Sequence, residues 1–428
     1  MSSVLIVSPH FPPATLAGVH RARHMAKHLP EFGWSPIIIR AGEEHYTETT
    51  DPELAGLVPS SVVQIRTGAF PSKLARKFGV GDLGLRAFYP IKKALERAVK
   101  VHRPAVIFIT GSPYYPLLLT SWIKKTFDIP VVLDFQDPWV SHEGAFRPKL
   151  SKGGISHLLA TILEPLALRD ARFVTSVSDR QNQEMADRYP WLDRTAMASI
   201  PIGGDPEDFD ALRANPPQSS IVRLEGGRIN LSYVGTFLPK AGPLVETLFD
   251  ALVQLREESP RLAQRLVLNF VGTSNQPDGG GSHLVTPIAS SKGVSDLVRE
   301  VPQRVPFLEA LNLLANSDGL MLIGSDEPHY TASKIYPALM SSTPYISLFH
   351  EASSAHEILS KSGGGFCHSL SSIGDLPKLV EGMKLDLASF AGKKVSLAPP
   401  NPAAYENYTA RSVAGQFAHV FGQISKRR

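Results

Sequence analysis

Short, continuous apolar runs recur along the chain, and each is followed by a longer polar or amphipathic segment. In the first half these runs occupy residues 4–7, 34–40, 62–66, 105–109, 131–135 and 173–176. The runs are too short for helices, and their apolar residues are largely consecutive rather than alternating, which is typical of strands buried on both faces. Strands that alternate with helices predict a parallel sheet covered on both sides. The predicted fold class is therefore α/β, with a doubly wound sheet.

A second series of the same kind starts after residues 199–228, where Pro, Gly and acidic residues cluster as in an interdomain connection. Its strands are predicted at residues 231–234, 266–271, 319–323 and 345–348. The chain has 428 residues, which is too long for one hydrophobic core. We predict a Rossmann-like domain at 1–203, a second at 222–404, and a C-terminal helix at 405–428 that packs back on the first.

The sequence contains no apolar stretch near the roughly 18–20 residues needed to cross a bilayer. The apolar run at residues 4–7 has no basic segment before it, so it predicts a strand rather than a signal peptide. Cys367 is the only cysteine, which excludes an intramolecular disulfide and fits a reducing compartment. We therefore expect a cytoplasmic protein.

The net charge is +4, and the excess is concentrated in residues 66–103, where ten Lys and Arg face only Asp82 and Glu96. Leu74 and Phe78 lie among these cations, which favours peripheral contact with an anionic membrane surface, such as the inner face of the cell membrane. An ordinary solvated face is the alternative. Nucleic acid is not expected as a partner, because no recognition module accompanies the charge.

Four segments in order resemble the family-4 glycosyltransferases: residues 4–13 followed by Gly18, residues 176–178, residues 200–209 and residues 233–235. The resemblance implies the GT-B fold, in which two doubly wound domains face each other across a cleft. It also implies retaining transfer of a sugar from a nucleotide-diphosphate donor. No metal or other cofactor is strictly required in this fold, because helix N-termini and basic side chains neutralise the leaving diphosphate.

Several residues at predicted strand ends of the first domain are candidates for the acceptor side of the site. Asp137 follows the strand at 131–135 and is the candidate catalytic residue, either as a general base or to orient the acceptor hydroxyl. In the family a His often stands at the position of Gln136, which cannot act as a base. His10, Arg21 and Trp139 are candidate acceptor contacts, with a solvated helix start for Arg21 and core packing for Trp139 as alternatives.

Glycine and small polar residues in both domains are candidates for binding the donor. Gly18 leaves room for backbone amides to approach a phosphate or sugar, although an ordinary βα turn explains it equally well. A helix predicted to start near Ser333 would point its amides at a diphosphate, with neighbouring hydroxyl and ammonium groups as further donors. The full set of candidate donor contacts is Gly18, Gly235, Thr236, Lys240, His329, Thr331, Ser333, Lys334, Ser353 and Ser354.

The second domain departs from the family pattern at four positions. The family usually has Arg and Lys at the positions of Thr236 and Ala241, and a pair of Glu residues at those of His329 and Pro337. The leading hypothesis is a glycosyltransferase that acts on a glycan, a lipid-linked or a small-molecule acceptor. The alternatives are a non-catalytic GT-B scaffold partner, which the missing Glu pair favours, and a nucleotide-sugar epimerase.

Overall fold

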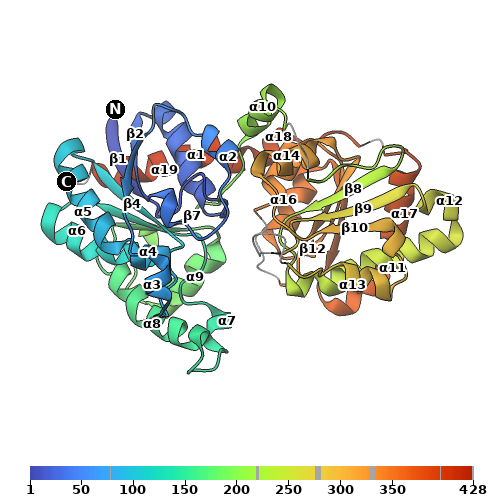
Figure 1. Ribbon diagram of the computed structural model, residues 1–428, viewed down its shortest axis with the longest axis horizontal. Coiled ribbons are helices and arrows are strands. Elements are labelled where there is room, and N and C mark those ends of the chain that lie inside the picture. Colours follow the sequence, from blue (N-terminus) through green and yellow to red (C-terminus); the bar gives the residue numbers. More distant parts are fainter. Residues whose placement is uncertain (78, 218–220, 275–280, 328–332, 396, 427–428) are drawn as a thin grey trace. The chain divides into compact units, whose positions relative to one another are not determined.

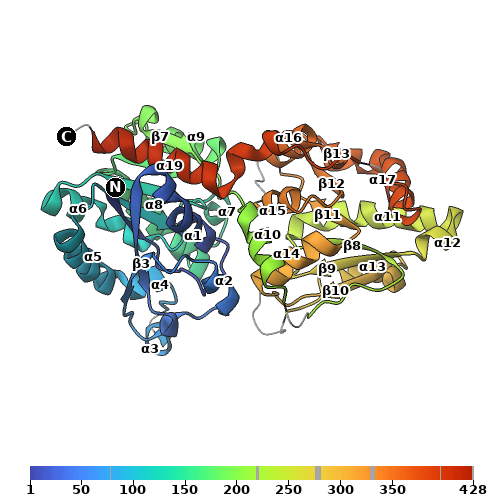
Figure 2. The ribbon, with the colours of Figure 1, turned by 90° about the horizontal axis from the view of Figure 1, so that it is seen from above.

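A computed structural model describes residues 1–77, 79–217, 221–274, 281–327, 333–395 and 397–426. The chain divides into two compact units. The first unit contains Met1–Gly203 and Ala410–Arg428, and the second contains Gly204–Thr409. Each unit is built around one parallel sheet with helices on both faces, as Figures 1 and 2 show. The α/β class and the doubly wound arrangement predicted from the apolar runs are confirmed.

The first sheet has the strand order β3-β2-β1-β4-β5-β6-β7, and every pairing in it is parallel. The order reverses between β1 and β4. Its strands are β1 (Ser2–Val7), β2 (Trp34–Ala41), β3 (Val63–Thr67), β4 (Val106–Gly111), β5 (Val131–Phe135), β6 (Phe173–Ser176) and β7 (Met197–Ser199).

Alternate side chains of the central strands enter two separate cores, one on each face of the sheet. Leu5 and Val7 of β1 pack in one core, while Val4 and Ile6 pack in the other. All four are 0 % exposed. Burial on both faces explains why the strand is apolar at consecutive positions.

The helices of the first unit divide between these two faces. α5 and α6 contribute to the core that contains Leu5, whereas α1 and α19 contribute to the core that contains Val4. The C-terminal α19 packs directly on α1 and thereby joins the two ends of the chain in one unit. The helices are α1 (Val19–His28), α2 (Pro52–Gly56), α3 (Ser72–Lys77), α4 (Leu83–Arg86), α5 (Phe88–His102), α6 (Thr120–Phe127), α7 (His142–Ala145), α8 (Lys152–Leu168), α9 (Asp179–Arg188) and α19 (Ala410–Ser425). Short 3-10 turns are η1 (Leu29–Phe32), η2 (Glu43–His45), η3 (Tyr115–Leu119) and η4 (Arg194–Ala196).

The second sheet repeats the same topology with the order β10-β9-β8-β11-β12-β13, again parallel throughout. Its order reverses between β8 and β11. The strands are β8 (Ile229–Val234), β9 (Leu266–Val271), β10 (Val298–Val301), β11 (Gly319–Ile323), β12 (Tyr345–His350) and β13 (Gly365–Leu370).

α11 and α17 lie side by side on one face of this sheet. The helices of the second unit are α10 (Pro206–Ala214), α11 (Gly242–Glu258), α12 (Pro260–Ala263), α13 (Thr286–Ser291), α14 (Phe307–Asn316), α15 (Ile335–Met340), α16 (Ser354–Ser362), α17 (Leu376–Ala391) and α18 (Pro402–Tyr405). Its 3-10 turns are η5 (Pro239–Ala241), η6 (Ser295–Leu297), η7 (Ile373–Asp375) and η8 (Glu406–Tyr408).

Two local expectations differ from the structure. The segment predicted as an irregular connection contains the helix α10, which Asp205 caps by accepting a hydrogen bond from the Glu207 N–H at 3.1 Å. The helix expected to start near Ser333 begins two residues later, at Ile335, and has six residues. Among the described residues, no helix has the length and apolar character needed to span a membrane.

Candidate functional site

The reversal of strand order places a candidate binding region in each unit. In open α/β sheets, ligands bind outside the carboxyl ends of the strands where the order reverses. In the first unit this point lies between β1 and β4, and in the second between β8 and β11. The candidate residues of both regions lie in the segments that follow these strands or their neighbours.

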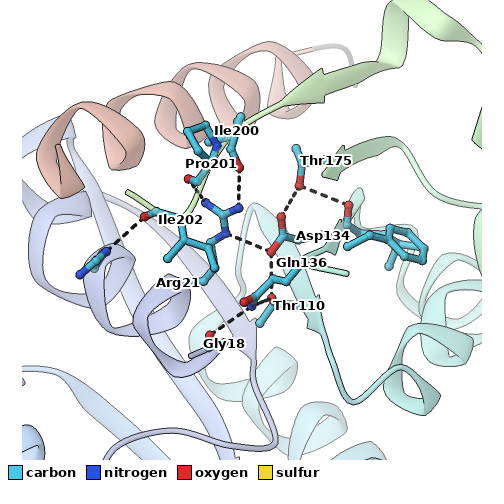
Figure 3. A network of polar contacts seen from close by, with 12 residues as sticks. Gly18, Arg21, Thr110, Asp134, Gln136, Thr175, Ile200, Pro201 and Ile202 are labelled. Atoms are coloured by element: carbon cyan, nitrogen blue, oxygen red, sulfur yellow. Dashed lines mark hydrogen bonds and ion pairs between the residues drawn. The ribbon is translucent and has the colours of Figure 1, made fainter. Parts of the chain in front are cut away.

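A buried ion pair occupies the first of these regions (Figure 3). Arg21 of α1 donates from Nε to Asp134 Oδ2 at 3.1 Å, and both side chains are 0 % exposed. The remaining guanidinium nitrogens donate to the carbonyls of Pro201 at 2.7 Å and Ile200 at 2.5 Å. Thr175 donates to the other carboxylate oxygen of Asp134 at 2.8 Å. This burial and bonding assign Arg21 a structural role rather than the acceptor contact predicted from the sequence.

Gln136 connects this ion pair to the glycine loop. Its Nε2 donates to the Gly18 carbonyl at 3.1 Å and to Thr110 Oγ1 at 2.6 Å, and the Thr110 hydroxyl in turn donates to Asp134 at 2.8 Å (Figure 3). A Cβ added at Gly18 would lie 3.0 Å from Gln136 Oε1. The absence of a side chain at Gly18 therefore makes room for Gln136, which is a specific structural reason for that glycine.

Asp137 follows this network and is exposed at the surface beyond β5. The surrounding protein removes part of its solvent, and this desolvation raises the pKa of its carboxyl group. Tyr114 donates to the Asp137 carbonyl at 2.9 Å and stacks on Trp139, with ring centroids 5.3 Å apart and planes at 12°. The stacking places Trp139 beside Asp137 while engaging one face of its ring, so packing and acceptor contact are both open to it.

His10 lies in the loop after β1, close to an acidic partner. Its Nε2 is 3.1 Å from Glu48 Oε1, and its ring lies 5.6 Å from that of Tyr46. Burial lowers the pKa of His10, although the Glu48 carboxylate opposes this shift. The structure thus brings His10 against Glu48 and Tyr46, and within the described part of the chain His10 does not contact Asp137.

The second unit holds a half-buried lysine at the corresponding point of its sheet. Lys334, in the segment between β11 and α15, donates to Tyr233 Oη at 2.5 Å, and its Nζ lies 4.0 Å from the centroid of the Tyr233 ring. Burial lowers the pKa of Lys334 to about 7. No carboxylate among the described residues forms an ion pair with it. A half-buried ammonium group in such surroundings favours an anionic ligand that restores its charge.

Backbone and side chains near Lys334 form the rest of this region. Gly235 directly follows β8 with φ +139°, and a Cβ built on it would lie 3.5 Å from Lys334 Cδ. The Tyr233 hydroxyl donates to the Thr236 carbonyl at 2.8 Å, so a chain of hydrogen bonds runs from Lys334 to the loop after β8. Lys240 forms an ion pair with Glu327, which links this loop to the segment after β11.

Three further predicted donor contacts are serines near this region or at the start of α16. Ser333 is exposed next to Lys334. Ser353 is 2 % exposed and accepts a hydrogen bond from the His356 N–H at 3.1 Å, so it acts as the N-cap of α16. Ser354 is the first residue of that helix and is exposed. His329 and Thr331 lie outside the described residues.

The described side chains of this region are two ammonium groups, a phenol, small hydroxyls and the Glu327 carboxylate, which is paired with Lys240. The ammonium and hydroxyl groups suit the oxygens of a phosphate, whereas a divalent cation favours carboxylate and carbonyl oxygens. The region around Lys334 can therefore bind a phosphate ester through charge-assisted hydrogen bonds. The close approach of backbone at Gly235 adds room for such a ligand.

The basic stretch at residues 66–103 does not form a single surface. Arg86 is 5 % exposed and donates to the carbonyls of Phe70 and His45, so it is a structural residue. Arg66, Lys93 and Arg97 line a groove of about 540 Å³ between β3 and α5. The cations of α3 belong to a separate element.

Three residues form interactions that the sequence did not predict, and one of them, Asp134, left a signal in the sequence. Asp134 is a charged residue inside an otherwise apolar strand, which indicates a buried partner. Tyr233 lies inside β8, where only the fold could show that its hydroxyl meets Lys334. Gln136 was considered only as the replacement of a base, and its bond to the Gly18 carbonyl required the coordinates.

Comparisons with known proteins agree with this architecture. Residues 17–203 match the family model of the glycosyl transferase 4-like domain. No curated protein matches the sequence. Similar solved structures include sucrose-phosphate synthase from Thermosynechococcus elongatus, with 14% identity, a TM-score of 0.61 and 100% of both chains covered.

Two further structures are similar over nearly the whole chain. Anabaena HepE in complex with UDP has 16% identity and a TM-score of 0.58, with 99% of this chain and 100% of that chain covered. The pneumococcal O-GlcNAc transferase GtfA in complex with UDP and GlcNAc has 9% identity and a TM-score of 0.60, with 99% of both chains covered. Residues 17–203 therefore form a glycosyl transferase 4-like domain, and the chain shares the GT-B fold of these solved structures over its whole length.

Proposed function

We propose that the protein transfers a sugar from a nucleotide-diphosphate donor, and that Lys334 binds the diphosphate. The observation that carries this proposal is the half-buried Lys334 ammonium group between β11 and α15, whose pKa lies near 7 and whose described partner is the neutral Tyr233 hydroxyl of β8. A diphosphate would supply the negative charge that favours the ammonium form. UDP is the first nucleotide to test, because HepE and GtfA were solved in complex with it.

The acceptor is proposed to bind the first unit near Asp137. Desolvation raises the pKa of this carboxyl group toward the range in which it can exchange a proton with a hydroxyl. Trp139 offers an aromatic surface that a sugar can contact. Asp137 would orient the acceptor hydroxyl or accept its proton. Retention of the anomeric configuration is expected from the family resemblance, and the anomeric proton signal of the product would report it.

Donor binding is tested by calorimetry with UDP, GDP, ADP and dTDP on the wild type and on Lys334→Met. We expect one nucleotide to bind, and we expect Lys334→Met to weaken it by at least about 30-fold, since a charge-assisted contact to a phosphate is lost. The matched control is Lys384→Met. Lys384 is 7 % exposed in the same unit but pairs with Glu258 and Glu381 on another face. Its replacement should leave nucleotide affinity unchanged.

Transfer itself is tested with Asp137→Asn, which keeps the size of the side chain but removes its basicity. Sugar transfer should fall by about 100-fold or more, within the usual contribution of general acid–base catalysis, while nucleotide affinity stays the same. If no nucleotide binds the wild type, the proposal fails and the scaffold alternative gains support. That alternative rests on the residues that replace the family's Glu pair, His329 and Pro337, and its Arg and Lys, Thr236 and Ala241.

A further inference from the structure

An apolar surface stands exposed on the segment that contains α7 and α8. Seven large apolar side chains are exposed between residues 146 and 166, and in α8 they follow helical spacing, so they share one face of the helix. The exposed side chains are Phe146 (76%), Leu150 (94%), Ile155 (48%), Leu158 (59%), Leu159 (41%), Ile162 (54%) and Leu166 (45%). Contiguous apolar patches of this kind mark interaction surfaces.

The opposite face of α8 is fixed to the first unit. Glu164 is 0 % exposed, accepts a hydrogen bond from the Val140 N–H at 3.1 Å and forms an ion pair with Arg188 at 2.6 Å. Ala160 and Ala167 are buried beside it. Because the buried face is anchored by charge as well as by packing, α8 cannot rotate to hide its apolar side chains without breaking these contacts.

The charge around the apolar face has one sign. Residues 144–163 contain three cations, Arg147, Lys149 and Lys152, and no acidic residue. All three are exposed, and none of them forms an ion pair with another described residue. The segment therefore offers an apolar face bordered by uncompensated positive charge.

A second element of the same composition lies at the same end of the first unit. In Figure 1, α3 lies toward the lower end of this unit, as α7 and α8 do, and Figure 2 shows that α3 is separated from both along the third direction. Phe70 and Leu74 are 50% and 44% exposed. Residues 70–77 carry Lys73, Arg76 and Lys77 without an acidic residue.

We propose that α8 with the preceding residues 146–151, assisted by α3, docks the protein on an anionic phospholipid membrane. The apolar side chains would enter the boundary between headgroups and acyl chains, and the cations would contact the lipid phosphates. A symmetric contact between two copies through this face would bring three cations against three cations, which disfavours a dimer. α8 has 17 residues and is anchored by its inner face, so it lies on the membrane rather than across it.

Docking of this kind would hold the acceptor side of the first unit near the lipid surface. α7 begins at His142, five residues after Asp137 along the chain. α8 also packs against η3, which follows the end of β4. The proposal does not depend on how the donor is bound, because every residue in it belongs to the first unit.

The test is cosedimentation of the full chain with vesicles of phosphatidylcholine alone or with 30% phosphatidylglycerol added. We expect binding to the anionic vesicles, weaker binding in high salt, and little binding to phosphatidylcholine alone. The triple variant Arg147→Gln, Lys149→Gln, Lys152→Gln should bind the anionic vesicles about 100-fold more weakly, at about fivefold for each cation. The triple variant Leu150→Ser, Leu158→Ser, Ile162→Ser should lose at least about tenfold.

The matched control carries equivalent changes in the second unit: Leu385→Ser, Lys393→Gln and Lys394→Gln. Leu385 is 58% exposed there. This variant should bind vesicles as the wild type does. Unchanged thermal midpoints and nucleotide affinity would show that all variants are folded. Failure of the wild type to bind anionic vesicles, or binding by both triple variants that equals the binding of the wild type, overturns the proposal. A wild-type dimer that the Leu150 variant dissociates, without vesicle binding, would overturn it in favour of self-association.

Discussion

The two units share one strand order, but the cations near their strand ends have different kinds of partner. In the first unit, Arg21 is paired with Asp134, and the surrounding hydrogen bonds involve two threonines, Gln136 and backbone carbonyls. In the second, Lys334 contacts a neutral phenol, and no described carboxylate pairs with it. The same topology therefore holds a cation in an ion pair in one unit and a cation without a described carboxylate partner in the other.

Removing Arg21 from its ion pair with Asp134 should have the largest effect on stability. Arg21→Met leaves the Asp134 carboxylate buried without its cation, which typically costs about 3–5 kcal/mol. Chemical denaturation of the wild type and the variant measures this loss. The double variant Arg21→Met, Asp134→Leu removes both charges and should recover part of it. A single variant as stable as the wild type would contradict a structural role for Arg21.

Removing the charge of Lys334, which has no described carboxylate partner, should instead stabilise the protein. The folded pKa of Lys334 is about 7, below the usual 10.5, so its burial cost is present in full below pH 7 and disappears as the pH rises from 7 to 10.5. Lys334→Met should therefore stabilise the unligated protein, by roughly 3 kcal/mol more at pH 6 than at pH 9.5. Thermal unfolding at both pH values measures this difference. An equal effect at both would show that the lysine is not desolvated.

Nucleotide binding should restore the charge of Lys334 and thus become pH-dependent. A bound diphosphate raises the pKa of the ammonium group, so binding takes up a proton above pH 7. Affinity should fall by up to about tenfold between pH 7.5 and 8.5, and calorimetry in buffers of different ionisation enthalpy should detect the proton. The residual binding of Lys334→Met should show neither effect. Proton uptake that persists in that variant would assign it to another group.

The smallest effect concerns the link between the ion pair and the glycine loop. Gln136→Ala removes the donor to the Gly18 carbonyl and to Thr110, which should cost about 1–2 kcal/mol of stability. Gly18→Ala should be tolerated in the Gln136→Ala background, because the side chain that the new Cβ would contact is absent there. Denaturation of both single variants and the double variant tests this coupling. Strictly additive losses would show that the two residues act independently.

A local signal in the sequence explains one helix that the apolar runs did not predict. Asp205-Pro206-Glu207 is an N-cap followed by proline at the first helical position, and it starts α10 inside the predicted connection. The strands β10 and β13 were not predicted, since neither is a continuous apolar run. They lie at the two edges of the second sheet, where one side of the strand has no neighbouring strand to pair with.

The sequence by itself determined the α/β class, the two parallel sheets and the set of strands at their centres. The physical reason is that a strand buried on both faces must be apolar at consecutive positions, and such runs are visible without coordinates. Only the tertiary structure decided what the charged and polar candidates do. Arg21 meets Asp134 across 113 residues, and Lys334 meets Tyr233 across 101, so no local pattern could distinguish the paired cation from the unpaired one. The exposed face of α8 was equally hidden, because its outer and inner sides are both apolar and only packing shows which side is covered.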